Sequence, residues 1–292
     1  MICIFSPVDK INGWNRPFAM FAKAIYILLN NYNIRTKIIQ NVSEAKNDDI
    51  IFYFTGHLLQ SSYVEQLSSL RQKVIVYNSE ALSRYNDLIT YIKTNENIIL
   101  NIDYYGSNTK RFRSLGLISH CCPPVFHESY QSENLLNNLT ENKEIDVLFY
   151  GSVSQRRKII LDKLIESGIK TVVVNSFNSI QEFESHILKT KIVLLISYLD
   201  EYRPIDYFRL NVLLSNNVFV IHEEIDESQF DERSFHCNKV VYSKYENIIQ
   251  TCKSYLSKTS QELLEIANDA HIEFHQNTLK KRFPISMFKQ LI

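Results

Sequence analysis

Short runs of apolar, often β-branched residues recur along the chain, and segments with a helical pattern separate them. The runs are continuous and do not alternate with polar residues, which is typical of parallel strands buried on both faces. They cover residues 2–7, 36–41, 49–55, 73–78, 97–102, 146–151, 170–175, 191–197, 218–223 and 239–243. This succession of strands and helices predicts an α/β protein with doubly wound parallel sheets.

The segments between the runs carry signals for the start and the end of helices. Pro17 stands at the beginning of the helical pattern 16–31, where its missing N–H group leaves no bond unmade. Gly168 ends the pattern 154–168, as expected of a helix C-cap. Further helical patterns cover residues 179–190, 205–215, 244–257 and 259–277.

The order of the elements predicts two Rossmann-like domains that face a cleft. Residues 127–144 are polar, rich in Asn and without strand character, so we interpret them as a linker. The N-terminal domain is then 1–126, and a second set of strands gives a C-terminal domain, 145–277. In such folds a ligand binds at the carboxyl ends of the strands.

Composition narrows the class of protein. The 292 residues contain 32 Lys and Arg and 32 Asp and Glu, so there is no overall positive field, which argues against nucleic acid as a partner. The five cysteines form no CxxC motif, which favours reduced thiols in the cytoplasm, or in a host's cytoplasm if the protein is viral. No apolar stretch approaches 18 residues, so we expect no transmembrane segment.

The corner after the run 146–151 combines features of a phosphate site. Gly151 and Ser152 follow the strand, and Arg156 and Arg157 fall in the first turn of the next helix. A strand–Gly–Ser–helix corner presents backbone N–H groups to a phosphate, and arginine adds bidentate charge. Since a helix N-terminus is itself positive, two cations there indicate either a bound anion or a basic turn that points into water.

A second group of charged residues lies near the end of the predicted domain. Asp206 and Arg209 are three residues apart on the helix 205–215, so they share one face. Glu223 ends the strand that follows. The start of this helix and the end of this strand both point toward the predicted cleft, although a plain surface ion pair is the alternative explanation for Asp206 and Arg209.

These segments resemble the C-terminal half of group-1-like GT-B glycosyltransferases. The resemblance is carried by "DVLFYGS", "KTKIVLLISY" and "IDYFRLNVLLSNNVFVIHE", with "VIVYNSEAL" and "NIDYYGSNTKRFRSLG" similar to segments of the N-terminal half. The acidic-x-x-Arg positions of the family are Asp206 and Arg209 here, and the terminal Glu is Glu223. The chain departs from the family where Asn217 replaces a Gly, where Asp206 replaces a Glu, and in lacking the two-glutamate motif.

The resemblance implies a glycosyltransferase that moves a sugar from a UDP- or GDP-sugar to a glycan or other hydroxyl acceptor. It implies no metal ion and no further cofactor, because helix N-termini and basic side chains stabilise the leaving diphosphate. Arg209 is expected at the pyrophosphate, Ser176 and Tyr198 near the base or ribose, and the helix 278–292 on the N-terminal domain. Transfer to modified DNA bases, a non-catalytic nucleotide- or glycan-binding protein, and a homodimer stay open.

An inverting enzyme also needs a general base on the acceptor side. The N-terminal half offers Asp9, His57, Glu80 and Asp103, all at or near predicted strand ends. We rank His57 and Glu80 first and name them, with Arg209, as the candidate catalytic residues. A structural role or plain exposure to solvent is the alternative explanation for each.

Overall fold

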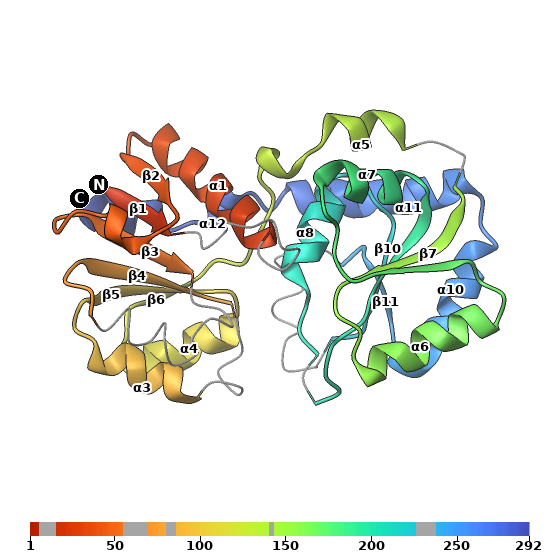
Figure 1. The fold of residues 1–292 in the computed structure, drawn as a ribbon, viewed down its shortest axis with the longest axis horizontal. Coiled ribbons are helices and arrows are strands. Elements are labelled where there is room, and N and C mark those ends of the chain that lie inside the picture. The colour runs from red at the N-terminus through yellow and green to blue at the C-terminus, as the bar shows by residue number, and fades with distance from the viewer. Residues whose placement is uncertain are drawn as a thin grey trace. The chain divides into compact units, whose positions relative to one another are not determined.

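The computed structural model of the protein describes residues 1–5, 16–54, 69–79, 86–139, 143–201, 203–225 and 238–291. The chain divides into two compact α/β units. Unit 1 comprises Met1–Lys10, Pro17–Pro124 and Leu279–Ile292, and unit 2 comprises Ile11–Arg16 and Val125–Thr278. The end of the chain therefore completes the first unit (Figure 1).

Unit 1 is built, within the described residues, on a six-stranded parallel sheet of order β2-β1-β3-β4-β5-β6. Its strands are β1 (Ile2–Phe5), β2 (Thr36–Ile39), β3 (Ile50–Phe54), β4 (Lys73–Asn78), β5 (Ile98–Asp103) and β6 (Ser119–Cys121). Every residue of β1 and β3 is buried. Burial on both faces explains why these strands are continuous apolar runs in the sequence.

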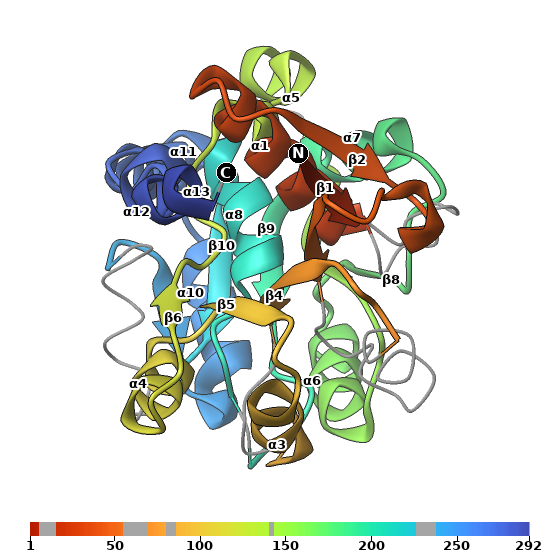
Figure 2. The same ribbon diagram turned by 90° about the vertical axis from the view of Figure 1, so that its left-hand side faces the viewer.

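Helices cover both faces of this sheet: α3 and α4 lie on one face, and α1, α12 and α13 on the other (Figures 1 and 2). Their bounds, with the short 3-10 helix η1, are α1 (Arg16–Asn31), η1 (Val42–Glu44), α3 (Asn86–Thr94), α4 (Gly106–Ser114), α12 (Leu279–Arg282) and α13 (Ile285–Leu291). The ring of Phe52 on β3 lies 6.4 Å from that of Phe283 and 6.1 Å from that of Phe288, centroid to centroid. The C-terminal segment therefore contributes to the core of unit 1.

Unit 2 contains, in the part that the structure describes, a five-stranded parallel sheet of order β11-β10-β9-β7-β8. Its strands are β7 (Ile145–Tyr150), β8 (Thr171–Val174), β9 (Thr190–Leu195), β10 (Val220–Glu223) and β11 (Val241–Ser243). The chain runs from β7 to β8 on one side and then returns past β7 to β9, β10 and β11. The direction of winding thus changes between β7 and β9, which is the topological switch point of a doubly wound sheet.

The helices of unit 2 also lie on both faces of its sheet. They are η3 (Glu128–Tyr130), α5 (Glu133–Asn138), α6 (Gln155–Glu166), α7 (Ile180–Leu188), α8 (Tyr207–Ser215), η5 (Tyr245–Asn247), α10 (Ile248–Leu256) and α11 (Ser260–His275). Helices α6 and α10 contact each other on one face, and α8 contacts α11 on the other (Figure 1). A buried cluster that includes Val147, Phe149, Ile192 and Leu194 joins the central strands to these helices.

The segment 127–144, predicted as a linker, lies within unit 2 where the structure describes it. The hydroxyl of Ser132 donates to Glu184 of α7 at 2.7 Å, and the backbone N–H of Ser132 donates to Asn216 at 2.6 Å. Asn216 in turn donates to the carbonyl oxygen of Tyr130 at 2.8 Å. Polar groups of this segment form hydrogen bonds with other parts of unit 2. The segment therefore has the polar composition of a linker although it packs on the unit.

Each of the ten predicted strand runs overlaps a strand of the structure, and β6 is the described strand that the pattern missed. The sequence of β6 is Ser-His-Cys, which has only three residues and no apolar run. Its place at the edge of the sheet, beside β5, lets it form with few buried side chains.

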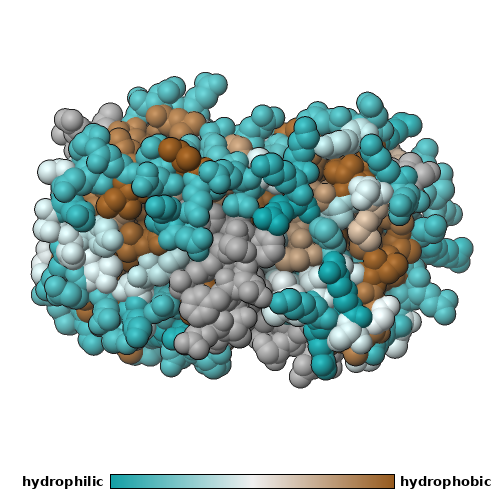
Figure 3. Space-filling model, turned by 180° about the vertical axis from the view of Figure 1, so that it is seen from behind, coloured by the Kyte–Doolittle hydropathy of each residue, from teal (hydrophilic) through white to brown (hydrophobic). Residues whose placement is uncertain are grey.

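Apolar residues reach the surface in separate patches with polar side chains between them, on the face shown in Figure 3. Scattered exposed apolar residues such as Ile118 and Ile165 are normal for a folded protein. Among the described residues, no helix is long and apolar enough to cross a membrane.

A buried carboxyl group lies at the end of β5. Asp103 is completely buried and accepts hydrogen bonds from the side-chain amides of Asn78 and Asn108 and from the backbone N–H of Tyr105, each at 2.9 Å. Burial raises the pKa of Asp103 to about 7, although these hydrogen bonds oppose the shift. Asp103 was a candidate general base, but its contacts are those of a structural residue that ties β4 and α4 to β5.

We expect this carboxyl group to make unit 1 less stable as the pH rises from about 5 to about 7. The pKa is 3.8 for an ordinary Asp and about 7 for folded Asp103, so between these values the folded state binds more protons than the unfolded state. The free energy of unfolding should fall by up to about 1.4 kcal/mol per pH unit in this window. Denaturant unfolding between pH 5 and pH 8 should show a smaller slope for Asp103→Asn than for the wild type. Asp162→Asn, at an exposed site, should leave the slope unchanged, and equal slopes in all three proteins would contradict the prediction.

Candidate functional site

The carboxyl ends of β7 and β9 lie at the switch point of the unit 2 sheet. In doubly wound folds, ligands bind outside the carboxyl ends of the strands at this point. Gly151 directly follows β7, and Ser197 stands two residues beyond the end of β9. Most of the residues selected from the sequence are found around this point.

Gly151 forms the turn from β7 into α6. Its φ of 121° is a conformation that residues with side chains rarely adopt, and a Cβ here would lie 3.3 Å from Nη1 of Arg209. The N–H of Gly151 donates to the carbonyl oxygen of Val174 at 2.8 Å. Ser154 then caps α6 by accepting the N–H of Arg157 at 3.3 Å. The turn therefore needs a glycine, and it brings the N-terminus of α6 next to the end of β7.

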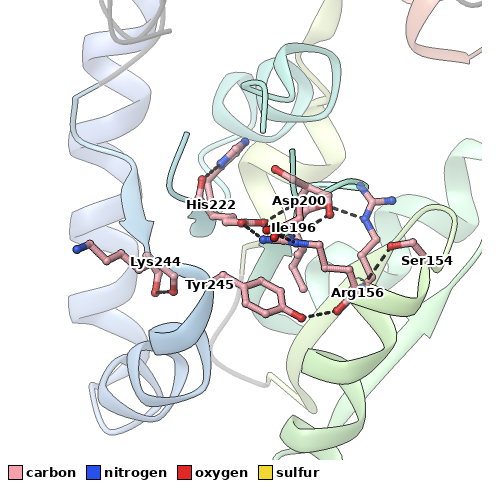
Figure 4. Close-up of polar contacts among 11 residues, drawn as sticks. Ser154, Arg156, Ile196, Asp200, His222, Lys244 and Tyr245 are labelled. Carbon is pink, nitrogen blue, oxygen red and sulfur yellow. Dashed lines mark hydrogen bonds and ion pairs between the residues drawn. The ribbon is translucent and has the colours of Figure 1, made fainter. Parts of the chain in front are cut away.

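Arg156 extends from α6 to the carboxylate of Glu223 at the end of β10. Figure 4 shows Arg156 with Asp200 and Tyr245, which it also contacts. Nη1 donates to Oε2 at 2.7 Å and Nη2 donates to Oε1, a bidentate pair. Nη1 also donates to the carbonyl oxygen of Ser197 at 3.3 Å, and Nε to Asp200 at 3.2 Å. The guanidinium carbon lies 3.9 Å from the centre of the Tyr245 ring. Only 11% of the Arg156 side chain is exposed, so it does not belong to a basic turn that points into water.

Glu223 is the fixed partner of Arg156. Its side chain is completely buried, and its Oε2 also accepts the backbone N–H of Ser197 at 2.9 Å. Breaking a buried ion pair costs about 3–5 kcal/mol because the remaining charge is left without a partner. Glu223 is therefore fixed by Arg156 and by the backbone of Ser197, and its predicted role in binding the donor stays a prediction.

Arg157 is a buried cation that forms no ion pair within the described residues. It is 7% exposed, and its Nε donates to the carbonyl oxygen of Ile196 at 2.9 Å and its Nη1 to that of Ser152 at 2.7 Å. Burial, and then the charge of Arg209, lower the pKa of Arg157 to about 10, so it stays charged at neutral pH. Its Nη2 donates to no described residue. A ligand anion would stabilise a guanidinium whose hydrogen bonds to described residues go only to carbonyl oxygens.

Asp206 and Arg209 form an ion pair at the start of α8. Asp206 is the N-cap and precedes the helix: Oδ1 accepts the N–H of Arg209 at 3.1 Å, and Oδ2 accepts Nε at 2.6 Å. Nη1 of Arg209 donates to the carbonyl oxygen of Tyr150 at 2.6 Å, which connects α8 to the end of β7. Burial alone would raise the pKa of Asp206, but the charge and hydrogen bonds of Arg209 outweigh it and lower the pKa. With 13% of its side chain exposed, Arg209 is not part of a plain surface pair.

His222 supports this pair from β10. Its Nε2 accepts the backbone N–H of Asp206 at 3.2 Å, and its Nδ1 contacts the carbonyl oxygen of Glu223. A neutral ring with its proton on Nδ1 satisfies both contacts. Burial lowers the pKa of His222, which favours this neutral form. The ring thus fixes the residue that caps α8.

The structure brings together most of the residues predicted to bind the donor. They are Gly151, Ser152, Arg156, Arg157, Tyr198, Asp206, Arg209 and Glu223. The Tyr198 ring is exposed and lies 5.3 Å from the guanidinium carbon of Arg157. Ser176 is exposed beyond β8 and forms no hydrogen bond with a described residue. The roles of Ser176 and Tyr198 near the base or ribose stay predictions.

The candidate catalytic residues of the N-terminal half, His57 and Glu80, lie outside the described residues, as does Asp9. In the sequence, Asp9 follows β1 and His57 follows β3, the two strands that flank the switch point of the unit 1 sheet. Glu80 comes two residues after the end of β4. Their catalytic roles stay predictions.

Two contributors to the site, Ser197 and Tyr245, had no role in the sequence analysis. Ser197 follows β9, and Tyr245 begins η5 just after β11. The hydroxyl of Tyr245 donates to the carbonyl oxygen of Arg156 at 2.7 Å. Both residues stand just beyond a strand, and this position was the signal in the sequence that could have identified them. The sequence does not show which strand ends lie within reach of Arg156.

The site has more positive than negative charge in its interior. Three guanidinium groups face the carboxylates of Asp206 and Glu223, and Asp200 is largely in solvent. The arrangement suits an anion that carries more than one charge, such as a diphosphate. Over the described ranges, no three His, Cys, Asp or Glu side chains come together as a metal site requires.

Comparison with known sequences gives distant viral relatives. No protein-family model matches the chain. Uncharacterized protein L140 of Acanthamoeba polyphaga mimivirus is 25% identical over 224 residues, which are 74% of this chain and 69% of that protein. Uncharacterized protein L876 of the same virus is 24% identical over 222 residues, and the match covers 71% of this chain and 53% of that protein.

Comparison with solved structures identifies the fold. Anabaena Alr3699/HepE in complex with UDP-glucose has a TM-score of 0.57 and 12% identity, over 99% of this chain and 97% of that chain. The E. coli trehalose-6-phosphate protein bound with UDP-2-fluoro glucose has a TM-score of 0.56 and 8% identity, over 93% and 78%. The Burkholderia multivorans trehalose 6-phosphate synthase has a TM-score of 0.54 and 7% identity, over 97% and 76%. The chain has the GT-B fold of these glycosyltransferases, with two parallel-sheet α/β units, and the predicted fold class is confirmed.

We expect Gly151→Ala to lower the free energy of unfolding by about 1–3 kcal/mol and to weaken the binding of nucleoside diphosphates. The variant strains the backbone, and its Cβ would meet Nη1 of Arg209. Gly168→Ala is the matched control, since Gly168 also has a positive φ, 79°, but no atom lies within 4 Å of an added Cβ. Both variants should melt earlier, and calorimetric titration should find weaker UDP or GDP binding only for Gly151→Ala. Equal nucleotide affinities in the two variants would contradict this role of the corner.

Proposed function

We propose that the protein is a glycosyltransferase that moves a sugar from a nucleoside-diphosphate donor, such as a UDP- or GDP-sugar, to a glycan or other hydroxyl acceptor. The observation that carries the proposal is Arg157, a buried guanidinium at a switch point with carbonyl contacts and no ion pair among the described residues. Solved structures with the same fold include complexes with UDP-glucose and UDP-2-fluoro glucose. These ligands are nucleoside-diphosphate sugars, and the proposal assigns an anion of this class to Arg157.

In this proposal unit 2 stabilises the leaving group. When the bond to the sugar breaks, negative charge develops on the departing diphosphate. Arg157 and the N-terminus of α6 would stabilise that charge, and both are held in place before a ligand binds, so little reorganisation accompanies the reaction. Arg209, fixed by Asp206 and Tyr150, is the second cation assigned to the diphosphate. These groups would take the place of a metal ion.

The acceptor side is assigned to the N-terminal half. If the reaction inverts the sugar carbon, a general base must take the proton of the acceptor hydroxyl. His57 and Glu80 remain the proposed bases, and the position of both just beyond strands of unit 1 supports this assignment. The complete burial of Asp103 leaves it as a structural group in the proposal.

The proposal is tested first with the wild-type protein. Thermal unfolding is measured with UDP, GDP, ADP and CMP, because a ligand that binds only the folded state raises the free energy of unfolding. At least one nucleoside diphosphate should raise the melting temperature, and the corresponding nucleotide-sugar should then be hydrolysed slowly without an acceptor. If none of the four nucleotides stabilises the protein, the proposed function is wrong.

We expect Arg157→Met to raise the dissociation constant of that nucleoside diphosphate at least about tenfold. A charge-assisted hydrogen bond contributes about 1.5–3 kcal/mol, and tenfold corresponds to about 1.4 kcal/mol. Lys158→Met is the matched control: Lys158 is the next residue of α6, carries the same charge, and pairs with Asp162 on the exposed face. Calorimetric titration of both variants measures the effect. An Arg157→Met protein that folds and binds as tightly as the Lys158→Met protein would remove the basis of the proposal.

A further inference from the structure

Arg156 contacts two carboxylates, of which one is buried and the other is exposed to solvent. Glu223 is completely buried and binds both terminal nitrogens of the guanidinium. The side chain of Asp200 is 80% exposed, and its Oδ1 accepts only from Nε, at 3.2 Å (Figure 4). One partner therefore belongs to the interior of unit 2, and the other lies in solvent at its surface.

The two contacts differ in how readily they can be exchanged. Losing the contact with Glu223 would leave a carboxylate buried without a cation, which costs about 3–5 kcal/mol. An exposed ion pair such as that with Asp200 contributes about 0–1 kcal/mol, since water solvates the free carboxylate well. An anion that approaches Arg156 would thus displace Asp200 and leave Glu223 in place.

The surroundings of Arg156 direct such an anion to the edge that Asp200 occupies. Glu223 and the carbonyl oxygen of Ser197 take N–H groups of the terminal nitrogens, and the Tyr245 ring covers one face of the guanidinium. Arg157 is held against Ile196, the residue before Ser197. Two guanidinium groups therefore lie along one short stretch of backbone, and Asp200 belongs to the same loop.

We propose that Asp200 occupies, in the ligand-free protein, the position on Arg156 that an anionic group of the ligand takes, and that Asp200 moves away when the ligand binds. Asp200 is then an autoinhibitory contact that lowers affinity for anions, and Glu223 is the positioning residue that keeps Arg156 in place. The inference rests on the proposed function for the identity of the ligand, the diphosphate of a nucleotide-sugar donor. The replacement of Asp200 by an anionic group of the ligand applies to any diphosphate.

The test compares Asp200→Asn with Glu201→Gln, using inorganic pyrophosphate and UDP as probes in calorimetric titrations. Glu201 is the next residue of the loop, is exposed, and forms no hydrogen bond or ion pair with a described residue. Both variants remove one negative charge from the same loop, but only Asp200→Asn removes it from a side chain that contacts Arg156. We expect Asp200→Asn to lower the dissociation constant of pyrophosphate about three- to fivefold, the equivalent of an exposed ion pair, and Glu201→Gln to change it less than about twofold.

A third variant separates the two partners of Arg156. Glu223→Gln keeps the shape of the side chain, but its amide nitrogen cannot accept the N–H groups that both oxygens of Glu223 accept from Arg156 and Ser197. Arg156 then loses its fixed position, so this variant should weaken pyrophosphate binding while Asp200→Asn strengthens it. Thermal unfolding of each variant checks that the protein remains folded, and Asp200→Ala should repeat the gain seen with Asp200→Asn.

Two results would overturn the inference. Equal effects of Asp200→Asn and Glu201→Gln would mean that only the overall charge of the loop matters. Weaker binding by Asp200→Asn would mean that Asp200 contacts the ligand directly. The proposed function fails separately: if no nucleotide binds but pyrophosphate binds more tightly to Asp200→Asn, the exchange at Arg156 stands and the nucleotide-sugar donor does not.

Discussion

The site in unit 2 depends on an excess of buried positive charge. Three guanidinium groups, from Arg156, Arg157 and Arg209, share one end of the sheet with the carboxylates of Asp206 and Glu223. Each carboxylate is bound to one arginine, so in the described part of the unit the hydrogen bonds of Arg157 go to carbonyl oxygens alone. Burying a charge without a counter-ion is costly, and a bound anion would remove that cost. Arg157 therefore lowers the stability of the protein without a bound anion and raises its affinity for one.

The ion pairs also connect elements that are far apart in the sequence. Arg156 and Glu223 join the first turn of α6 to the end of β10, and Arg209 joins α8 to the end of β7 through the carbonyl oxygen of Tyr150. β7 and β10 end at the carboxyl edge of the sheet, and α6 and α8 begin there, beside the switch point between β7 and β9. The side chains that hold the cations thus also close the end of the sheet, so the geometry of the site is set by the fold before a ligand is present.

The sequence predicted the elements better than the contacts. Continuous apolar runs located the strands, because burial on both faces leaves a strong local signal, whereas the three polar residues of β6 leave none. The Gly151 corner and the Asp206–Arg209 spacing are also local, and both belong to the observed site. The pairing of Arg156 with Glu223 spans 67 residues and depends on strand order, which no local pattern encodes. For the same reason the sequence alone does not show whether Arg157 is solvated or buried.

The departures from the GT-B pattern have physical explanations in this chain. Asn217 replaces the usual glycine of the turn before β10, and it adopts a φ of 57°, a left-handed conformation that asparagine tolerates better than most residues. Asp206 replaces a glutamate, and its shorter side chain caps α8 and binds Arg209 at the same time, as N-cap residues with short acceptors do. Neither change removes a cation from the end of the sheet. The substituted residues therefore preserve the excess of positive charge on which binding of an anion depends, even though the motif that usually accompanies it is incomplete.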